Sequence, residues 1–150
     1  MIRPTGPTRP TGLTRDAGFQ IGVSRTLPLP PEAVWRFLVS AEGTALWLGH
    51  GAVLPSERGA AWTAADGTSG ELRSRHEGSR VRLTRRPAGP GAESTVQVTV
   101  IPRGEGATVR FHQERLADAA GREERRRHWR SVMDALEQAL SPAADRPPRG

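Results

Sequence analysis

The chain has 150 residues, and its 22 basic and 16 acidic side chains give a formal charge of +6. This length suits one domain, which would bury roughly two-thirds of its unfolded surface. Every basic residue is arginine, and Cys, Lys, Tyr and Asn are absent. The lack of cysteine excludes disulfides, thiolate nucleophiles and cysteine-based zinc sites, and the lack of lysine excludes Schiff-base chemistry.

The positive charge is not concentrated in the central part of the chain. Residues 19–140 hold 17 arginines against 14 acidic residues, so half of the excess lies in the two ends. A domain with a net charge of +3 is a weak candidate for a polyanion partner, so we expect no nucleic acid. No apolar run approaches the roughly 20 residues that span a bilayer, and no signal-peptide core is present, so we expect no membrane span and a cytoplasmic location.

Both ends of the chain are typical of disordered tails. The stretch RPTGPTRPTGLTR gives one hexapeptide unit twice, and proline and glycine interrupt it too often for a helix or strand. The final stretch SPAADRPPRG has the same character. We therefore predict tails at 1–17 and 141–150, and one folded domain at 18–140.

The first elements of the domain are a strand and two short helices. Apolar and polar residues alternate over 19–27, which predicts a half-buried strand that prolines then end. Pro31 suits the first turn of a helix at 32–39. TALWLG, at 44–49, predicts a second short helix, and a faint strand follows at 51–54.

The remaining sequence predicts an antiparallel meander and a long helix. Five alternating segments are separated by short glycine-containing links, as in consecutive hairpins. They lie at 60–65, 70–77, 80–86, 94–102 and 107–116. With the first strand, this gives about six strands. From 119 to 140 the apolar residues Trp129, Val132, Met133, Leu136 and Leu140 follow a helical period.

Two stretches resemble a known family. SRTLPLPPEAVWRFLVSAEGTALWLG and RHWRSVMDALEQAL are similar to the SRPBCC or START-like superfamily, in the branch of homologues of the activator of heat-shock protein ATPase. The resemblance covers about 19–140. It implies an α+β helix-grip fold, in which a curved antiparallel sheet wraps a long C-terminal helix, with two short helices after the first strand. It also implies a cavity for an apolar or amphipathic small molecule.

Some polar residues share the phase of the inward apolar positions. Strand alternation places Ser74, His76, Arg85 and Gln113 toward the helix. An unpartnered buried polar group costs roughly 1–3 kcal/mol, so these residues need a protein partner, water or a ligand. Arg85 and Arg115 stand at strand ends, where we expect solvent. For His76 we weigh a hydrated rim position, a ligand-orienting role and acid–base work.

The four tryptophans divide into two groups. Trp35 stands among apolar residues in a helix, which favours core packing, whereas the others lie nearer the expected cavity ends. Core filling and ligand contact both remain open for them. The predicted ligand-binding residues are Trp47, Trp62, His76, Leu83, Val98, Phe111, Gln113, Trp129 and Met133.

The sequence contains no metal or catalytic signature. The histidines at 50, 76, 112 and 128 have no HxxxH or HxH spacing, and neither a phosphate-binding loop nor GxSxG is present. We therefore predict no metal, no cofactor and no catalytic residue. The arginine-rich REERRRHWR favours a solvated helix end over a nucleic-acid contact.

These observations favour a domain that binds or carries an apolar or amphipathic small molecule, rather than an enzyme. One alternative is a cyclase or hydrolase that uses the same cavity with His76 as acid or base. Another is an interaction module that regulates a protein partner, as the resemblance to chaperone-ATPase activators implies. A monomer and a homodimer are both compatible with the sequence.

Overall fold

The computed structural model describes residues 13–14 and 18–141. Its three helices are α1 (Pro31–Val39), α2 (Ala41–Trp47) and α3 (Ala119–Leu140). Its strands are β1 (Leu13–Thr14), β2 (Gly18–Leu27), β3 (Ala61–Thr63), β4 (Ser69–His76), β5 (Arg80–Arg85), β6 (Ser94–Arg103) and β7 (Gly106–Leu116). None of these helices is long and apolar enough to cross a membrane.

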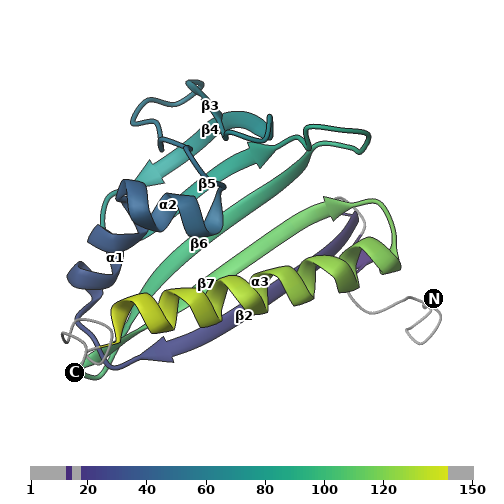
Figure 1. The fold of residues 1–150 in the computed structure, drawn as a ribbon. Coiled ribbons are helices and arrows are strands. Elements are labelled where there is room, and N and C mark those ends of the chain that lie inside the picture. The colour runs from purple at the N-terminus through teal and green to yellow at the C-terminus, as the bar shows by residue number, and fades with distance from the viewer. Residues whose placement is uncertain (1–12, 15–17, 142–150) are drawn as a thin grey trace, which may run out of the picture.

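The strands form one antiparallel sheet that curves around α3. Their order is β1-β2-β7-β6-β5-β4-β3, so the first long strand pairs with the last. In Figure 1, α3 runs along β2 and β7, and α1 and α2 lie between α3 and the arm that contains β4 and β5. The predicted helix-grip fold, with six main strands, two short helices and a long final helix, is confirmed.

Two sequence-based expectations differ from the structure. Leu13–Thr14 pairs with Gly18 and Phe19 as a short strand, although it lies in the predicted N-terminal tail. The other predicted tail residues, 1–12, 15–17 and 142–150, lie outside the described residues. The predicted strand at 51–54 is wrong. Ala52 and Leu54 are buried and Val53 is exposed, but this alternation belongs to a loop without ladder bonds.

The helix pair α1–α2 is fixed by short-range polar contacts. Pro31 occupies the first position of α1, where its missing N–H is no loss. The Ser40 hydroxyl accepts a hydrogen bond from the Gly43 N–H at 3.1 Å and caps α2. The Trp47 indole N–H donates to the Leu38 carbonyl at 2.8 Å, which joins the end of α2 to α1.

An aromatic cluster fills the space between the sheet and α3. The Phe111 ring from β7 stacks on the Trp129 ring from α3, with centroids 4.6 Å apart, and the Trp47 ring from α2 lies 6.0 Å from Phe111. All three side chains are buried. Aromatic pairs of this kind add to the hydrophobic contribution of the area they bury, so this cluster holds three elements together.

Gly70 allows Trp62 to cross the β4 strand. The Trp62 indole N–H donates to the Thr84 carbonyl on β5 at 3.0 Å. A Cβ atom on Gly70 would lie 1.8 Å from that carbonyl oxygen and 2.5 Å from the indole nitrogen. Only a residue without a side chain fits between the indole and β5.

Replacement of Gly70 by alanine should therefore destabilise the fold by about 3 kcal/mol, because an overpacked buried site must shift backbone or indole. Denaturant unfolding followed by tryptophan fluorescence measures this loss. The control is Gly89→Ala, since a Cβ at Gly89 meets no atom within 4 Å and its φ is not positive. Equal stability of the two variants would contradict the close packing at Gly70.

Candidate functional site

The polar residues that the sequence places toward the helix separate into two groups. In β5 and β7 the predicted phase holds, and Arg85 and Gln113 lie on the helix side with the buried Leu83 and Phe111. In β4 it does not hold. Leu72 pairs with Leu83 but Ser74 pairs with Arg82, so one extra residue stands in β4 between these pairs. This bulge reverses the face of every later residue in the strand.

The reversal places His76 away from the helix. His76 pairs with Arg80 and Ser74 with Arg82, on the face opposite to Val81 and Leu83, and His76 is exposed. The prediction that Ser74 and His76 point inward is therefore wrong. Arg75 takes the inward phase instead, pairs with Val81, and donates from Nη1 to the Pro55 carbonyl at 3.0 Å.

Gln113 is the centre of a buried polar network. Its side-chain oxygen accepts from the Trp129 indole N–H and from Arg125 Nε, both at 2.9 Å. Its side-chain nitrogen donates to Ser94 Oγ at 2.8 Å. These bonds connect β7, β6 and α3. Because Gln113 is only 1% exposed, losing them would leave buried polar atoms unsatisfied.

A pocket of about 160 Å³ lies beside this network, between the sheet and the first turns of α3. We call it the α3 pocket. Polar groups of Arg85, Ser94, Gln113, Arg115 and Arg125 line it together with Glu124 and the small or apolar residues Pro87, Ala92, Leu116, Ala117 and Gly121. The backbone of Arg115 has a φ of +68° where the β2–β7 register shifts, and its side chain is exposed at the rim.

All three arginines of the α3 pocket lack an ion-pair partner among the described residues, and two of them, Arg85 and Arg125, are also partly buried. Within residues 18–141, neither Arg85 nor Arg125 forms an ion pair. Burial lowers the pKa of Arg85. Burial, followed by the charge of Arg85, lowers the pKa of Arg125 to about 10, which leaves it a cation at neutral pH. The pocket therefore presents two partly desolvated positive charges.

The field of these charges reaches His128. Its ring lies edge-on to Trp129, with centroids 4.8 Å apart. Burial first, and then Arg125 and Arg85, lower the pKa of His128 from 6.5 to about 4. His128 is therefore neutral at physiological pH and adds no further positive charge near the pocket.

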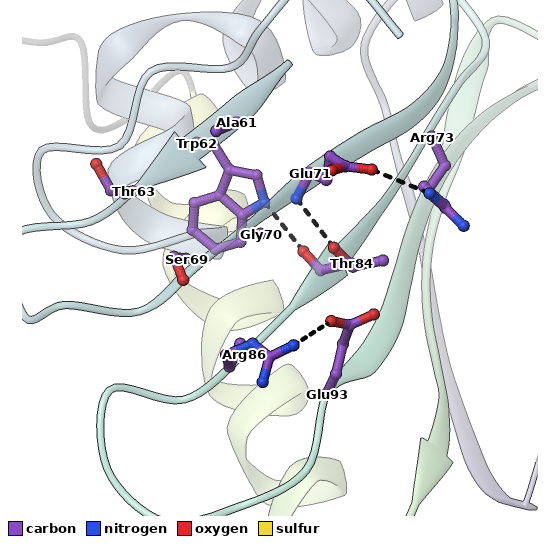
Figure 2. A pocket seen from close by; sticks show the side chains of 10 residues that line it. All are labelled: Ala61, Trp62, Thr63, Ser69, Gly70, Glu71, Arg73, Thr84, Arg86 and Glu93. Atoms are coloured by element: carbon purple, nitrogen blue, oxygen red, sulfur yellow. Dashed lines mark hydrogen bonds and ion pairs between the residues drawn. The ribbon is translucent and has the colours of Figure 1, made fainter. Parts of the chain in front are cut away.

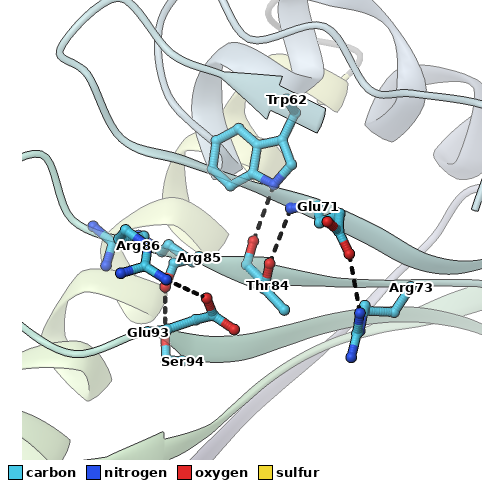
Figure 3. Close-up of polar contacts among 8 residues, drawn as sticks. All are labelled: Trp62, Glu71, Arg73, Thr84, Arg85, Arg86, Glu93 and Ser94. Carbon is cyan, nitrogen blue, oxygen red and sulfur yellow. Dashed lines mark hydrogen bonds and ion pairs between the residues drawn. The ribbon is translucent and has the colours of Figure 1, made fainter. Parts of the chain in front are cut away.

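A second, larger pocket on the β3–β4 edge differs in its electrostatics. It has about 360 Å³ and is shown in Figure 2. Its charged side chains are paired: Arg73 with Glu71 at 3.0 Å and Arg86 with Glu93 at 2.9 Å. Figure 3 shows the same pairs beside the Trp62–Thr84 bond. Because these charged groups form ion pairs with one another, this pocket has no partly buried charge without an ion pair, in contrast to the α3 pocket.

The structure places the predicted ligand-binding residues in three locations. Gln113 lines the α3 pocket, and His76 is exposed on the opposite face of the sheet. The other seven belong to one buried core cluster: Trp47, Trp62, Leu83, Val98, Phe111, Trp129 and Met133. Trp129 also donates to Gln113, so the core and the pocket meet at this pair.

Sequence reasoning missed Ser94 and Arg125. Arg125 precedes Trp129 by four residues, a spacing that puts both on one face of α3. The arginine-rich composition of the helix start concealed this signal. Ser94 is the first residue of β6, two before Val96, so its inward phase was also present in the sequence.

The charge of Arg125 should have a measurable effect on the pKa of His128. In the variant Arg125→Met we expect the pKa of His128 to rise above about 4 but to stay below 6.5, because burial is its larger cause. NMR titration of the imidazole protons measures the pKa. The control Arg130→Met removes an exposed charge from the same helix and should leave the value unchanged. An unaltered pKa in Arg125→Met would contradict the coupling.

The same histidine should make stability depend on pH. The folded-state pKa of about 4 lies below the ordinary 6.5, so between these values the unfolded chain binds more protons. Stability from His128 is therefore present above pH 6.5 and lost as the pH falls toward 4. In His128→Gln, urea unfolding at several pH values should show a shallower dependence in this window. An identical slope would exclude a contribution from His128.

The sequence and the fold are similar to those of known proteins. A family model for activator of Hsp90 ATPase homolog 1-like proteins matches residues 28–141. No curated protein matches the sequence.

Three solved structures illustrate the similarity in fold. CV1439 from Chromobacterium violaceum is 27% identical with a TM-score of 0.65, and the match covers 82% of this chain and 97% of that one. PFC0360w, an HSP90 activator from Plasmodium falciparum, is 16% identical with a TM-score of 0.67, over 81% of this chain and 95% of its own.

DynU16, from the dynemicin biosynthetic locus, is 19% identical with a TM-score of 0.71 over 83% of this chain. The match covers 48% of DynU16, so the chain spans about half of its length. At identities of 16% and 19%, PFC0360w and DynU16 show similarity of fold and nothing more. The family model, in contrast, covers the domain from the end of β2 to the end of α3, and the chain belongs to the family of activator of Hsp90 ATPase homolog 1-like proteins.

Proposed function

We propose that this chain binds a small amphipathic molecule at the α3 pocket. The observation that carries the proposal is that Arg85 and Arg125, which form no ion pair, line one pocket together with apolar residues between the sheet and α3. Small-molecule sites combine apolar walls with a few placed polar groups in this way. The fixed amide of Gln113 supports it further, because it positions one of these cations.

The size of the pocket limits how the ligand is held. Typical sites for drug-sized molecules have roughly 300–1,000 Å³, whereas the α3 pocket has about 160 Å³. Only part of such a ligand can enter, and the rest lies across the rim. Trp129 and Phe111 form the packed floor behind this site rather than the walls of a deep cavity.

The side chains at the pocket favour binding over catalysis. His76, the acid or base of the enzyme alternative, is exposed on the opposite face of the sheet. The Ser94 hydroxyl accepts from Gln113 and donates to the Arg85 carbonyl at 3.5 Å, so no base activates it as a nucleophile. We therefore do not propose a reaction.

A role as a protein-interaction module is the second candidate. The filled aromatic core between sheet and α3 favours it, because such a core leaves little interior space for a ligand. The surface favours it less. Among the described residues, Val53, at 73% exposed, is the one large hydrophobic side chain that stands out in solvent. A docking surface of the apolar kind would need a larger exposed patch.

A variant with a bulky side chain in the α3 pocket tests the leading proposal. We expect small amphipathic molecules found by a thermal-shift screen of the wild-type protein to lose their effect in Ala117→Trp, where the indole would occupy the rim. The control Ala119→Trp adds the same group at an exposed position outside the pocket lining and should retain the shift. Equal shifts in wild type and Ala117→Trp would place binding elsewhere and contradict the proposal.

A further inference from the structure

We infer that the ligand of the α3 pocket carries a carboxylate, which Arg85 and Arg125 bind together. This inference rests on the proposed function and specifies its ligand class. It starts from the charges. Of the three arginines that line this small pocket, two, Arg85 and Arg125, are partly removed from water. Partly buried cations are normally paired with acids or hydrogen-bond acceptors. Here Arg125 has one acceptor, the Gln113 side-chain oxygen, and the Arg85 side chain has none, so an anion would supply the partner that both charges lack.

Among the partly buried arginines of the described residues, only Arg85 and Arg125 form no ion pair. Elsewhere on the sheet, partly buried arginines form ion pairs: Arg82 pairs with Glu114 at 2.8 Å, and Arg25 pairs with Asp134 at 2.6 Å. Two acids act on these arginines from a distance: the charge of Asp66 acts on Arg85 and that of Glu124 on both, but neither acid forms an ion pair with them. The fold thus leaves two cations open at a concave site.

Arg125 is held in place before any ligand arrives. Its Nε–H donates to Gln113, and its guanidinium carbon lies 5.5 Å from the centre of the Trp129 ring. Trp129 in turn donates to the same amide oxygen of Gln113. A guanidinium fixed through Nε keeps its terminal N–H groups available as a planar fork. Such preorganisation reduces the entropy lost on binding.

The shape of the pocket favours a carboxylate over a larger anion. A planar carboxylate matches the guanidinium fork with two parallel hydrogen bonds. A volume of about 160 Å³ accommodates this group and a few carbon atoms, and Pro87, Leu116 and Ala117 supply contacts for an apolar chain. The carboxylate of a short amphipathic acid would bind the arginines, and its carbon chain would contact the apolar residues of the lining.

The test uses hexanoate and its neutral isostere hexanamide, with the full-length protein and isothermal titration calorimetry at low salt. We expect hexanoate to bind wild type at least tenfold more tightly than hexanamide. In Arg85→Met and Arg125→Met we expect at least tenfold weaker hexanoate binding. The control Arg130→Met makes the same change in net charge at an exposed position on α3 and should bind as wild type does. Glu124→Gln should strengthen binding, because it removes a competing negative charge.

Arg85→Met also separates a binding defect from a folding defect. Within the described residues the Arg85 side chain makes no hydrogen bond, so its removal should leave the melting temperature equal to or above that of wild type. A stable Arg85→Met protein that no longer binds hexanoate supports the inference. A stable variant that binds as wild type does overturns it.

The remaining outcomes distinguish the inference from the proposed function. Equal binding of hexanoate and hexanamide, both blocked by Ala117→Trp, would overturn the carboxylate assignment and leave the binding function intact. Tight binding of inorganic phosphate with none of hexanoate would also overturn the assignment, in favour of a phosphate group. If neither these probes nor a metabolite screen gives binding that Ala117→Trp removes, the proposed function itself fails.

Discussion

The amide of Gln113 is the interaction on which the helix-to-sheet arrangement at this end of the molecule depends. It stands on β7, accepts hydrogen bonds from two residues of α3 and donates one to β6. A buried amide with these bonds satisfied orients its neighbours, because any displacement of α3 would break charge-assisted and indole contacts together. The position of Arg125, and with it the character of the α3 pocket, follows from this one side chain.

The aromatic cluster fills the space between sheet and helix and so limits the volume of the α3 pocket. Helix-grip domains can leave open space between sheet and helix, but here Phe111, Trp129 and Trp47 occupy it. Core packing of this density contributes strongly to stability and leaves no room for a long ligand beneath the helix. The side chains that stabilise the core therefore occupy the volume that a ligand would need, and the pocket that remains lies at the charged end near the start of α3.

The sequence predicts most of the fold, because the fold follows from local patterns. Strict alternation identified β5, β6 and β7 and the inward residues Val81, Val98 and Phe111, all of them buried. The helical period identified the buried face of α3 from Trp129 onward. These patterns need no knowledge of distant contacts, since burial of one face imposes them on each element separately.

The candidate site was only partly predictable, for two physical reasons. The bulge in β4 changes the face of His76, and no residue type in that strand marks the extra position. The partnership of Gln113 with Arg125 joins residues from different elements, and its 2.9 Å bond depends on how α3 docks on β7. Single-sequence patterns report the face of an element and do not report which side chains meet across an interface.

Arg85 and Arg125 are partly desolvated without an ion pair, which costs the folded state free energy. Acids of the domain form ion pairs with other arginines of the sheet, whereas Glu124 lies in the same pocket as Arg85 and Arg125 and pairs with neither. Arg85, whose replacement by an uncharged residue should not weaken the fold, is a poor candidate for a structural role, whereas Arg125 also holds α3 through its bond to Gln113. Buried charge that lowers stability without a structural partner is characteristic of binding sites, where the missing partner is supplied by the ligand. For this reason we propose the α3 pocket as the ligand site, rather than the larger pocket at the β3–β4 edge, whose charged groups pair with one another.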